Sequence, residues 1–155
     1  LNGIAVADDG TIYASNTRPV SQMWKVTANG ETSLFAEGTP LNAPNGVAID
    51  QDGNIVVVNV GDSAVITYNQ DGTVARMEQS GEGGSDGVVV TADGTKYVSS
   101  VRYGSVSRIP PGGDAEIIAS GIPSAASMCY DSTQNQLVIP MNPNYALAFV
   151  TLDSQ

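Results

Sequence analysis

The chain of 155 residues is long enough for one domain, with 41% hydrophobic and 14% charged residues. Its 16 acidic and 6 basic residues give a net charge of −10, a field that repels nucleic acid and anionic membranes and argues against both as partners. Histidine is absent, which excludes a Ser-His-Asp triad and histidine-based zinc sites, so any chemistry must use carboxylates, amides, hydroxyls, lysine, tyrosine or a bound metal.

A short motif recurs along the chain and predicts its organisation. It is clearest at Asn45–Gly53, and other copies begin at Asn2 and Asp86, with a weaker one at Ser127. The copies are 41 to 43 residues apart. A period near 40 residues, filled with strand-like segments and Asp-Gly turns, is typical of a propeller of four-stranded blades.

Within each repeat, short apolar runs separated by Gly, Asn and Asp turns predict antiparallel strands joined in chain order. No window has helical periodicity, so the predicted fold class is an all-β propeller; a β-sandwich is the alternative, but it does not impose a constant period. The expected strands are 12–14, 23–26 and 33–36, then 46–49, 55–58, 64–68 and 73–78, then 97–99, 106–109 and 116–119, and finally 137–139 and 146–151.

The repeats predict one β-propeller region over residues 1–155, with blades starting near residues 2, 45, 86 and 127. Propellers of this kind usually have six to eight blades, so we expect the chain to be the C-terminal portion of a larger propeller. A four-bladed ring is one alternative. Completion of the ring by a second copy is another. The compartment stays open between cytoplasm and periplasm.

The residues that head the repeats are candidate site residues. In a propeller the first strand of each blade lines the central channel, so Asn2, Asn45, Asp86 and Ser127 are expected to form an inner ring. The second strand returns to the same face, which adds the residues fourteen positions further on: Asn16, Asn59, Ser100 and the pair at 141–142. Carboxylate and amide oxygens suit calcium, magnesium or manganese. Alternatively, the Asn-Gly and Asp-Gly pairs are simply turn residues.

Two further residues carry expectations. Arg102 follows Ser100 in a loop on the same predicted face, where it would contact an anionic or sugar-like ligand or merely order the loop. Cys129 is the only cysteine, which excludes an internal disulfide. It lies among apolar residues of an expected strand, so we predict a buried structural thiol.

The segments Asn45–Gly53 and Asp86–Val90 resemble motifs of the gluconolactonase/senescence-marker-protein family. These are six-bladed propellers with one divalent cation in the channel. The resemblance covers essentially the whole chain, as the family's third to sixth blades. The period and turns are also similar to those of the wider NHL-repeat and strictosidine-synthase-like propellers.

The resemblance implies a divalent-metal-dependent hydrolase of a lactone or related ester. It matches Asn45 and Asp86 to metal ligands, Asp86 also to the acid/base, and Asn2 to a channel asparagine near metal and substrate. Calcium is the expected cation, with magnesium, manganese and zinc as alternatives. The family's remaining ligand, a glutamate of its first blade, has no counterpart here. A non-catalytic propeller that binds a small ligand or protein, or a propeller lyase that opens a cyclic ester, stays open. The residues predicted to contact substrate are Asn2, Asn16, Asn59, Ser100, Arg102 and Ser127.

Overall fold

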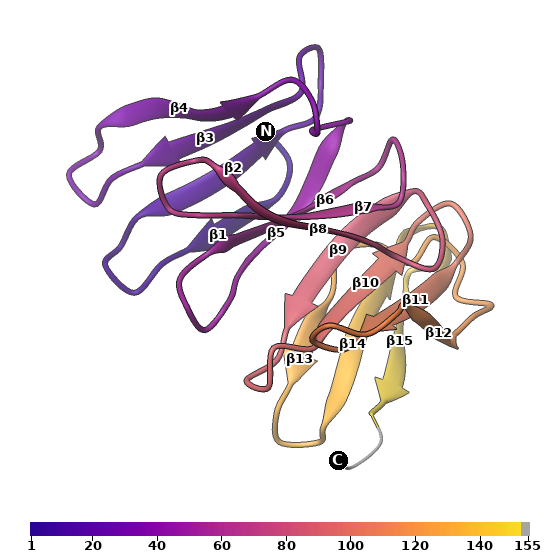
Figure 1. The fold of residues 1–155 in the computed structure, drawn as a ribbon. Helices are drawn as coiled ribbons and strands as arrows, with labels where there is room; N and C mark the ends of the chain where they lie inside the picture. Colours follow the sequence, from indigo (N-terminus) through magenta and orange to yellow (C-terminus); the bar gives the residue numbers. More distant parts are fainter. Residues whose placement is uncertain (153–155) are drawn as a thin grey trace.

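The computed structural model describes residues 1–152, which fold into four antiparallel sheets that follow one another in chain order (Figure 1). The first sheet contains β1 (Ile4–Val6), β2 (Ile12–Asn16), β3 (Gln22–Val26) and β4 (Thr32–Glu37). The second contains β5 (Pro44–Ile49), β6 (Ile55–Asn59), β7 (Ala64–Tyr68) and β8 (Val74–Gln79). The third contains β9 (Ser85–Val90), β10 (Lys96–Ser100), β11 (Ser105–Ile109) and β12 (Glu116–Ala119). The fourth contains β13 (Cys129–Asp131), β14 (Gln136–Met141) and β15 (Ala146–Thr151).

Within each sheet, strands that are consecutive in the chain pair with one another, so each sheet is a meander of the kind that forms a propeller blade. The predicted fold class is confirmed, and the four sheets form part of a propeller rather than a closed ring. The fourth sheet has three strands within the described residues. A 3-10 helix, Asn142–Asn144, follows β14. Residues 1–152 include no helix that is both long and apolar enough to cross a membrane.

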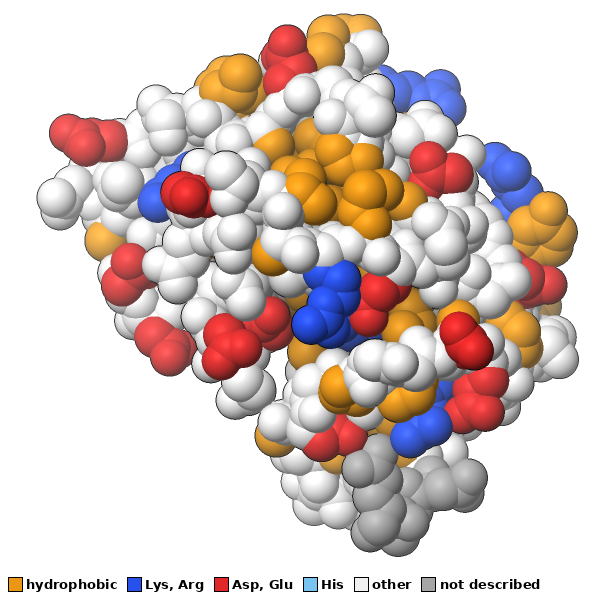
Figure 2. Space-filling model, in the orientation of Figure 1, with side chains coloured by type: hydrophobic (Ala, Val, Ile, Leu, Met, Phe, Trp, Pro, Cys, Tyr) orange, Lys and Arg blue, Asp and Glu red, His pale blue; other side chains and the backbone are white. Residues whose placement is uncertain are grey.

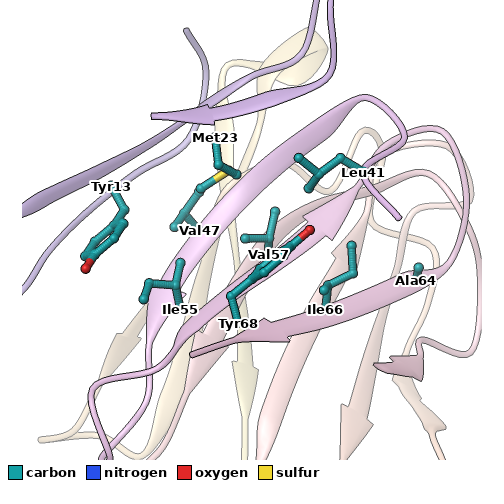
Figure 3. Close-up of a cluster of buried hydrophobic side chains, with 9 residues drawn as sticks. All are labelled: Tyr13, Met23, Leu41, Val47, Ile55, Val57, Ala64, Ile66 and Tyr68. Atoms are coloured by element: carbon teal, nitrogen blue, oxygen red, sulfur yellow. The ribbon is translucent and has the colours of Figure 1, made fainter. Parts of the chain in front are cut away.

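The hydrophobic core consists of three layers, one between each pair of successive sheets. The layer between the first and second sheets includes Tyr13, Met23, Val57 and Ile66 (Figure 3). Val56, Val65 and Val98 belong to the layer between the second and third sheets, and Leu137 and Ile139 to the one between the third and fourth.

A strand between two such layers is buried on both faces. For this reason β6, β7 and β10 are buried along their whole length. The continuous β-branched run Ile55–Val58 is the sequence signature of that burial, since a strand with one solvated face would alternate with polar residues. The outermost strands β4 and β8 are largely exposed.

The two terminal sheets present apolar side chains to solvent. On the first sheet Ile4 and Val6 are exposed, and on the fourth Leu147 and Phe149 are exposed. Cys129 is exposed too, so the prediction of a buried thiol is wrong. Its strand register explains the result, because Cys129 lies beside Val138 and Phe149 on the face turned away from the third sheet. Acidic side chains outnumber basic ones on the face drawn in Figure 2, in keeping with the net charge.

Candidate functional site

A β-bulge at the start of the inner strand positions the motif residue in two of the sheets. In the second sheet, Pro44 pairs with Asn59 and Val47 with Val57, so Asn45 and Gly46 together oppose a single residue. The third sheet repeats this arrangement, and Asp86 and Gly87 oppose Ser99. Bulges of this kind re-aim a side chain, which here directs the Asn45 and Asp86 side chains toward each other.

The glycines of the motif serve close packing between sheets rather than turns. A Cβ on Gly46 would lie 2.5 Å from the Asp86 carbonyl oxygen, and one on Gly3 would lie 2.0 Å from the Asn45 carbonyl oxygen. On Gly87 it would meet Ser127 Cα at 2.9 Å. None of the three has a positive φ, whereas Gly10, Gly53 and Gly94 in the hairpin turns do. The turn interpretation of these Asn-Gly and Asp-Gly pairs is therefore wrong.

Asp86 accepts a hydrogen bond from each of two other predicted ring residues, Asn45 and Ser127. Asn45 Nδ2 donates a hydrogen bond to Asp86 Oδ2 at 3.1 Å, and Ser127 Oγ donates to Asp86 Oδ1 at 3.3 Å. Burial raises the pKa of the Asp86 carboxyl above its ordinary value, and the hydrogen bonds from Ser127 and Asn45 oppose that rise. Residues from the second sheet, the third sheet and the segment that leads into the fourth thus meet at one carboxylate.

The amide of Asn45 has a second, unused oxygen. Asn45 is 5% exposed, and its Oδ1 is buried without a hydrogen-bond partner. A buried carbonyl oxygen without a partner is costly and calls for a donor or a cation. Together with the Asp86 carboxylate, it supplies hard oxygen ligands of the type that calcium binds. These two side chains have the chemistry that a cation needs, but they supply few ligands. Residues 1–152 contain no cluster of three or more His, Cys, Asp and Glu that could hold a metal.

Asn2 lies apart from this hydrogen-bonded trio. Its side chain is exposed, and Nδ2 donates to Thr17 Oγ1 at 3.1 Å. Thr17 Oγ1 in turn donates to the carbonyl oxygen of Pro44 at 2.7 Å, directly before Asn45. Asn2 is therefore connected to the second sheet through one hydroxyl, and its contact with metal or substrate stays a prediction.

The second set of predicted residues lies at the end of the second strands, where each side chain donates to a backbone carbonyl of a neighbouring loop. Asn16 Nδ2 donates to the Val20 carbonyl at 3.1 Å. Asn59 is fully buried, and its Nδ2 donates to the Pro40 carbonyl at 3.0 Å while its Oδ1 has no partner. Ser100 Oγ donates to the Gly83 carbonyl at 2.7 Å. None of these bonds reaches Asp86.

Two serines that sequence reasoning missed connect adjacent sheets beside the ring. Ser15 Oγ accepts the Gly3 N–H at 2.8 Å and donates to the Asn45 carbonyl at 2.6 Å. Ser99 Oγ accepts the Gly87 N–H at 2.8 Å and donates to the Ala126 carbonyl at 2.7 Å. Each lies twelve residues after its motif glycine, a spacing that the sequence shows in the first and third repeats.

Arg102 lies at the same end of the third sheet as Asp86, because the register pairs Ser100 at the end of β10 with Ser85 at the start of β9. It is exposed and lines a cavity of about 230 Å³ with Tyr103, Ile122 and Pro123. The cavity opens between the β10–β11 loop and the segment that enters the fourth sheet. Arg102 is therefore accessible to a ligand, but among residues 1–152 no side-chain hydrogen bond connects it with Asp86.

Comparisons with solved structures find the same fold in several propeller proteins. A gluconolactonase from Xanthomonas campestris is 20% identical over 97% of this chain and 56% of its own, with a TM-score of 0.75. Virginiamycin B lyase from Staphylococcus aureus is 13% identical over 97% and 55%, with a TM-score of 0.73. A chain of the nidogen/laminin complex is 17% identical over 89% and 55%, with a TM-score of 0.75.

These structures confirm the resemblance to gluconolactonase-like and NHL-type propellers at the level of the fold. The chain spans about half the length of each of them. No family model matches the sequence. No curated protein matches it either. The similar structures include gluconolactonases and a lyase, and these activities are those of the matched proteins.

Proposed function

We propose that the protein is a hydrolase of a lactone or a related cyclic ester, with Asp86 as its general base and a divalent cation beside it. The observation that carries the proposal is the hydrogen-bonded trio of Asn45, Asp86 and Ser127, next to the unpartnered Asn45 Oδ1. The fold that the chain shares with gluconolactonases supports it. Because the chain spans about half of these neighbours, the proposal concerns the activity of the whole propeller.

The environment of Asp86 suits a proton acceptor. A base works best when its pKa is nearer the working pH than that of an ordinary carboxylate, and burial raises the pKa of Asp86 in that direction. Asn45 and Ser127 each donate to one carboxylate oxygen and fix the orientation of the group. Asp86 would take a proton from water as the water oxygen bonds to the ester carbonyl carbon. The ring C–O bond then breaks, and that proton passes to the departing alkoxide.

Asn45 Oδ1 and the Asp86 carboxylate are the residues that would hold the cation, calcium in the first instance. A bound divalent cation polarises an ester carbonyl and stabilises the oxyanion that develops on it. Because a cation favours the charged carboxylate, its binding would offset the effect of burial and keep Asp86 ionised, the form that accepts a proton. Asn45 keeps its amide nitrogen toward Asp86 in this arrangement, so one side chain serves both neighbours.

The test is to compare cation binding and lactone hydrolysis in three forms of the protein: wild type, Asp86→Asn and Asp114→Asn. Calcium should raise the thermal unfolding midpoint of the wild type, with magnesium, manganese and zinc tested in parallel. Asp86→Asn should lose this shift and about 10²-fold or more of the hydrolysis rate, the usual contribution of a general base. Asp114 is an exposed loop carboxylate, so Asp114→Asn controls for the change in charge. Equal responses of all three forms would refute the proposal, whereas cation binding without hydrolysis would favour a non-catalytic binding protein.

Elimination by a lyase is the second candidate, because virginiamycin B lyase shares the fold. A catalytically inactive form of that enzyme is a histidine-to-alanine variant. This chain contains no histidine, so its own residues would need another base for elimination. The product mass separates the two reactions: hydrolysis adds one water to the substrate, and elimination adds none.

A further inference from the structure

A cavity of about 360 Å³ lies between the second and third sheets, at the end of the strands opposite the ring. The β5–β6 turn, strand β8 and the start of β10 contribute to its walls. Asn45 is at the beginning of β5, while Asp50 directly follows its last residue, so the length of a strand separates this cavity from Asp86. Its volume is within the range of small-molecule sites.

A hydroxyl without a partner lines this cavity. Thr67 is 6% exposed, and its Oγ1 is buried with no hydrogen-bond partner. The register places Thr67 between Val56 and Arg76 on the face of the second sheet that is turned toward the third. Leaving a buried hydroxyl unpaired is unfavourable, and a ligand in the cavity would satisfy it.

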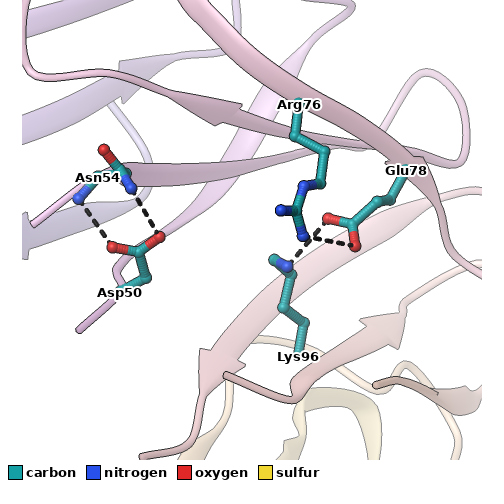
Figure 4. A network of polar contacts seen from close by, with 5 residues as sticks. All are labelled: Asp50, Asn54, Arg76, Glu78 and Lys96. Atoms are coloured by element: carbon teal, nitrogen blue, oxygen red, sulfur yellow. Dashed lines mark hydrogen bonds and ion pairs between the residues drawn. The ribbon is translucent and has the colours of Figure 1, made fainter. Parts of the chain in front are cut away.

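Two cations share one carboxylate beside Thr67. Lys96 is 5% exposed, and its Nζ lies 2.9 Å from Glu78 Oε2, an ion pair between β10 and β8. Arg76 Nη1 approaches the same carboxylate at 4.0 Å, and the Arg76 side chain is 56% exposed. Figure 4 shows both cationic groups directed at Glu78. One carboxylate cannot neutralise two cations, so this wall has surplus positive charge and free N–H donors on Arg76.

The opposite wall is acidic. Asp50 and Asp52 belong to the β5–β6 turn and line the cavity, as does Asp93 of the neighbouring turn. Asp50 is fixed in place because its Oδ1 accepts from the Asn54 backbone N–H at 2.8 Å and its Oδ2 from Asn54 Nδ2 at 3.1 Å (Figure 4). These bonds orient the carboxylate without removing its charge.

From this arrangement we infer that the cavity binds a small zwitterion, a molecule with one carboxylate and one ammonium group, such as a free amino acid. The ligand carboxylate lies against Arg76 and the Thr67 hydroxyl, and the ammonium lies against the carboxylates of the β5–β6 turn. Complementary charge at both ends selects a zwitterion over a simple anion or cation, since each half alone would meet one wall of like charge. The inference does not depend on the proposed hydrolase site.

The experiment measures thermal stabilisation and calorimetric binding with glycine, β-alanine and 5-aminovalerate at constant ionic strength, with a chelator present. Acetate and ethylammonium serve as the two half-ligands. At least one of the zwitterions should raise the unfolding midpoint and bind measurably, and neither half-ligand should match it. No effect of any zwitterion, or an equal effect of a half-ligand, would overturn the inference. The chelator keeps the result separate from any cation at Asp86.

Variants identify the cavity as the site. Thr67→Val retains the shape of the side chain but removes the hydroxyl. Arg76→Gln removes the guanidinium group that would bind the carboxylate of the ligand. Each should weaken zwitterion binding about tenfold or more, the scale of a lost hydrogen bond to a charged group. Thr32 is an exposed threonine of β4, so Thr32→Val is the matched control and should bind as the wild type does. Wild-type affinity in Arg76→Gln would overturn the inference even if Thr67→Val failed to fold.

Discussion

The substitution Gly46→Ala tests whether the inner strands pack as closely as the structure shows. The added Cβ would lie 2.5 Å from the Asp86 carbonyl oxygen and 3.0 Å from Val88 N, both backbone atoms of β9. The first of these distances is about 0.9 Å short of 3.4 Å, where ordinary contact begins. The Val58 side chain, at 3.0 Å, can rotate away, but the strand backbone cannot. The second and third sheets must therefore separate at the ring.

The expected cost follows from two opposing effects. Overpacking of a filled interior costs about 1–3 kcal/mol. Replacing glycine by alanine stiffens the unfolded chain and offsets about 0.4–1 kcal/mol of that cost. The midpoints of these two ranges, about 2 and about 0.7 kcal/mol, leave a net loss of about 1.3 kcal/mol in the free energy of unfolding of Gly46→Ala, which for a chain of this size corresponds to roughly 3–5 °C in the unfolding midpoint.

Urea denaturation and thermal unfolding of the wild type and two variants measure this cost. Gly83→Ala is the matched control, because its Cβ would meet Asp62 at 3.4 Å, an ordinary contact, and Gly83 has no positive φ. The control lacks the clash but keeps the effect on the unfolded chain, so it should be about 0.4–1 kcal/mol more stable than the wild type. If Gly46→Ala were as stable as Gly83→Ala, the close approach of β5 to Asp86 would be refuted, and with it the explanation of the Asn-Gly motif.

Three further predictions concern single groups. Burial raises the pKa of Asp86, so folding favours the protonated form of its carboxyl. Without added cation, the wild type should therefore lose stability relative to Asp86→Asn as the pH rises from about 3.8 through the raised pKa. Parallel curves of the urea midpoint against pH for the two proteins would contradict this. Ser99→Ala leaves the Gly87 N–H and the Ala126 carbonyl without their partner and should cost about 1–3 kcal/mol in urea denaturation; a cost below that range would mean that the hydroxyl is dispensable. Burial raises the pKa of Tyr68 to about 12, so the wild type should lose stability relative to Tyr68→Phe as the pH rises from 10 through 12. The tyrosinate absorbance of Tyr68, taken as the difference between the two proteins, should develop near pH 12; its appearance near pH 10 would contradict the burial of Tyr68.

The repeat period and the β-branched runs were sufficient to predict the fold. Ile55–Val58 is apolar throughout because layers cover both of its faces, and this pattern is visible in the sequence alone. The exposure of Cys129 could not be predicted in this way, because its strand lies in a terminal sheet with one open face and apolar neighbours in the sequence do not reveal which face is covered.

The candidate site was predictable only in part. The in-phase recurrence of Asn45, Asp86 and Ser127 identified residues that do meet through hydrogen bonds. Counting fourteen residues onward reached Ser100, although the neighbouring Ser99 is the residue that bonds to the segment leading into the fourth sheet. Side chains alternate between the two faces of a strand, so an error of one position selects the opposite face.

The serine and glycine contacts beside the ring have a consequence for recombination between propellers. The backbone of Asn45 is held by Ser15 and approached by Gly3, both of the preceding sheet. A blade transplanted from another protein therefore brings its own ring residue but depends on the host blade before it for that residue's position. Chimaeras joined at the start of a motif should disturb the ring at the junction. Those that transfer a motif residue together with the preceding blade's glycine and serine should preserve it.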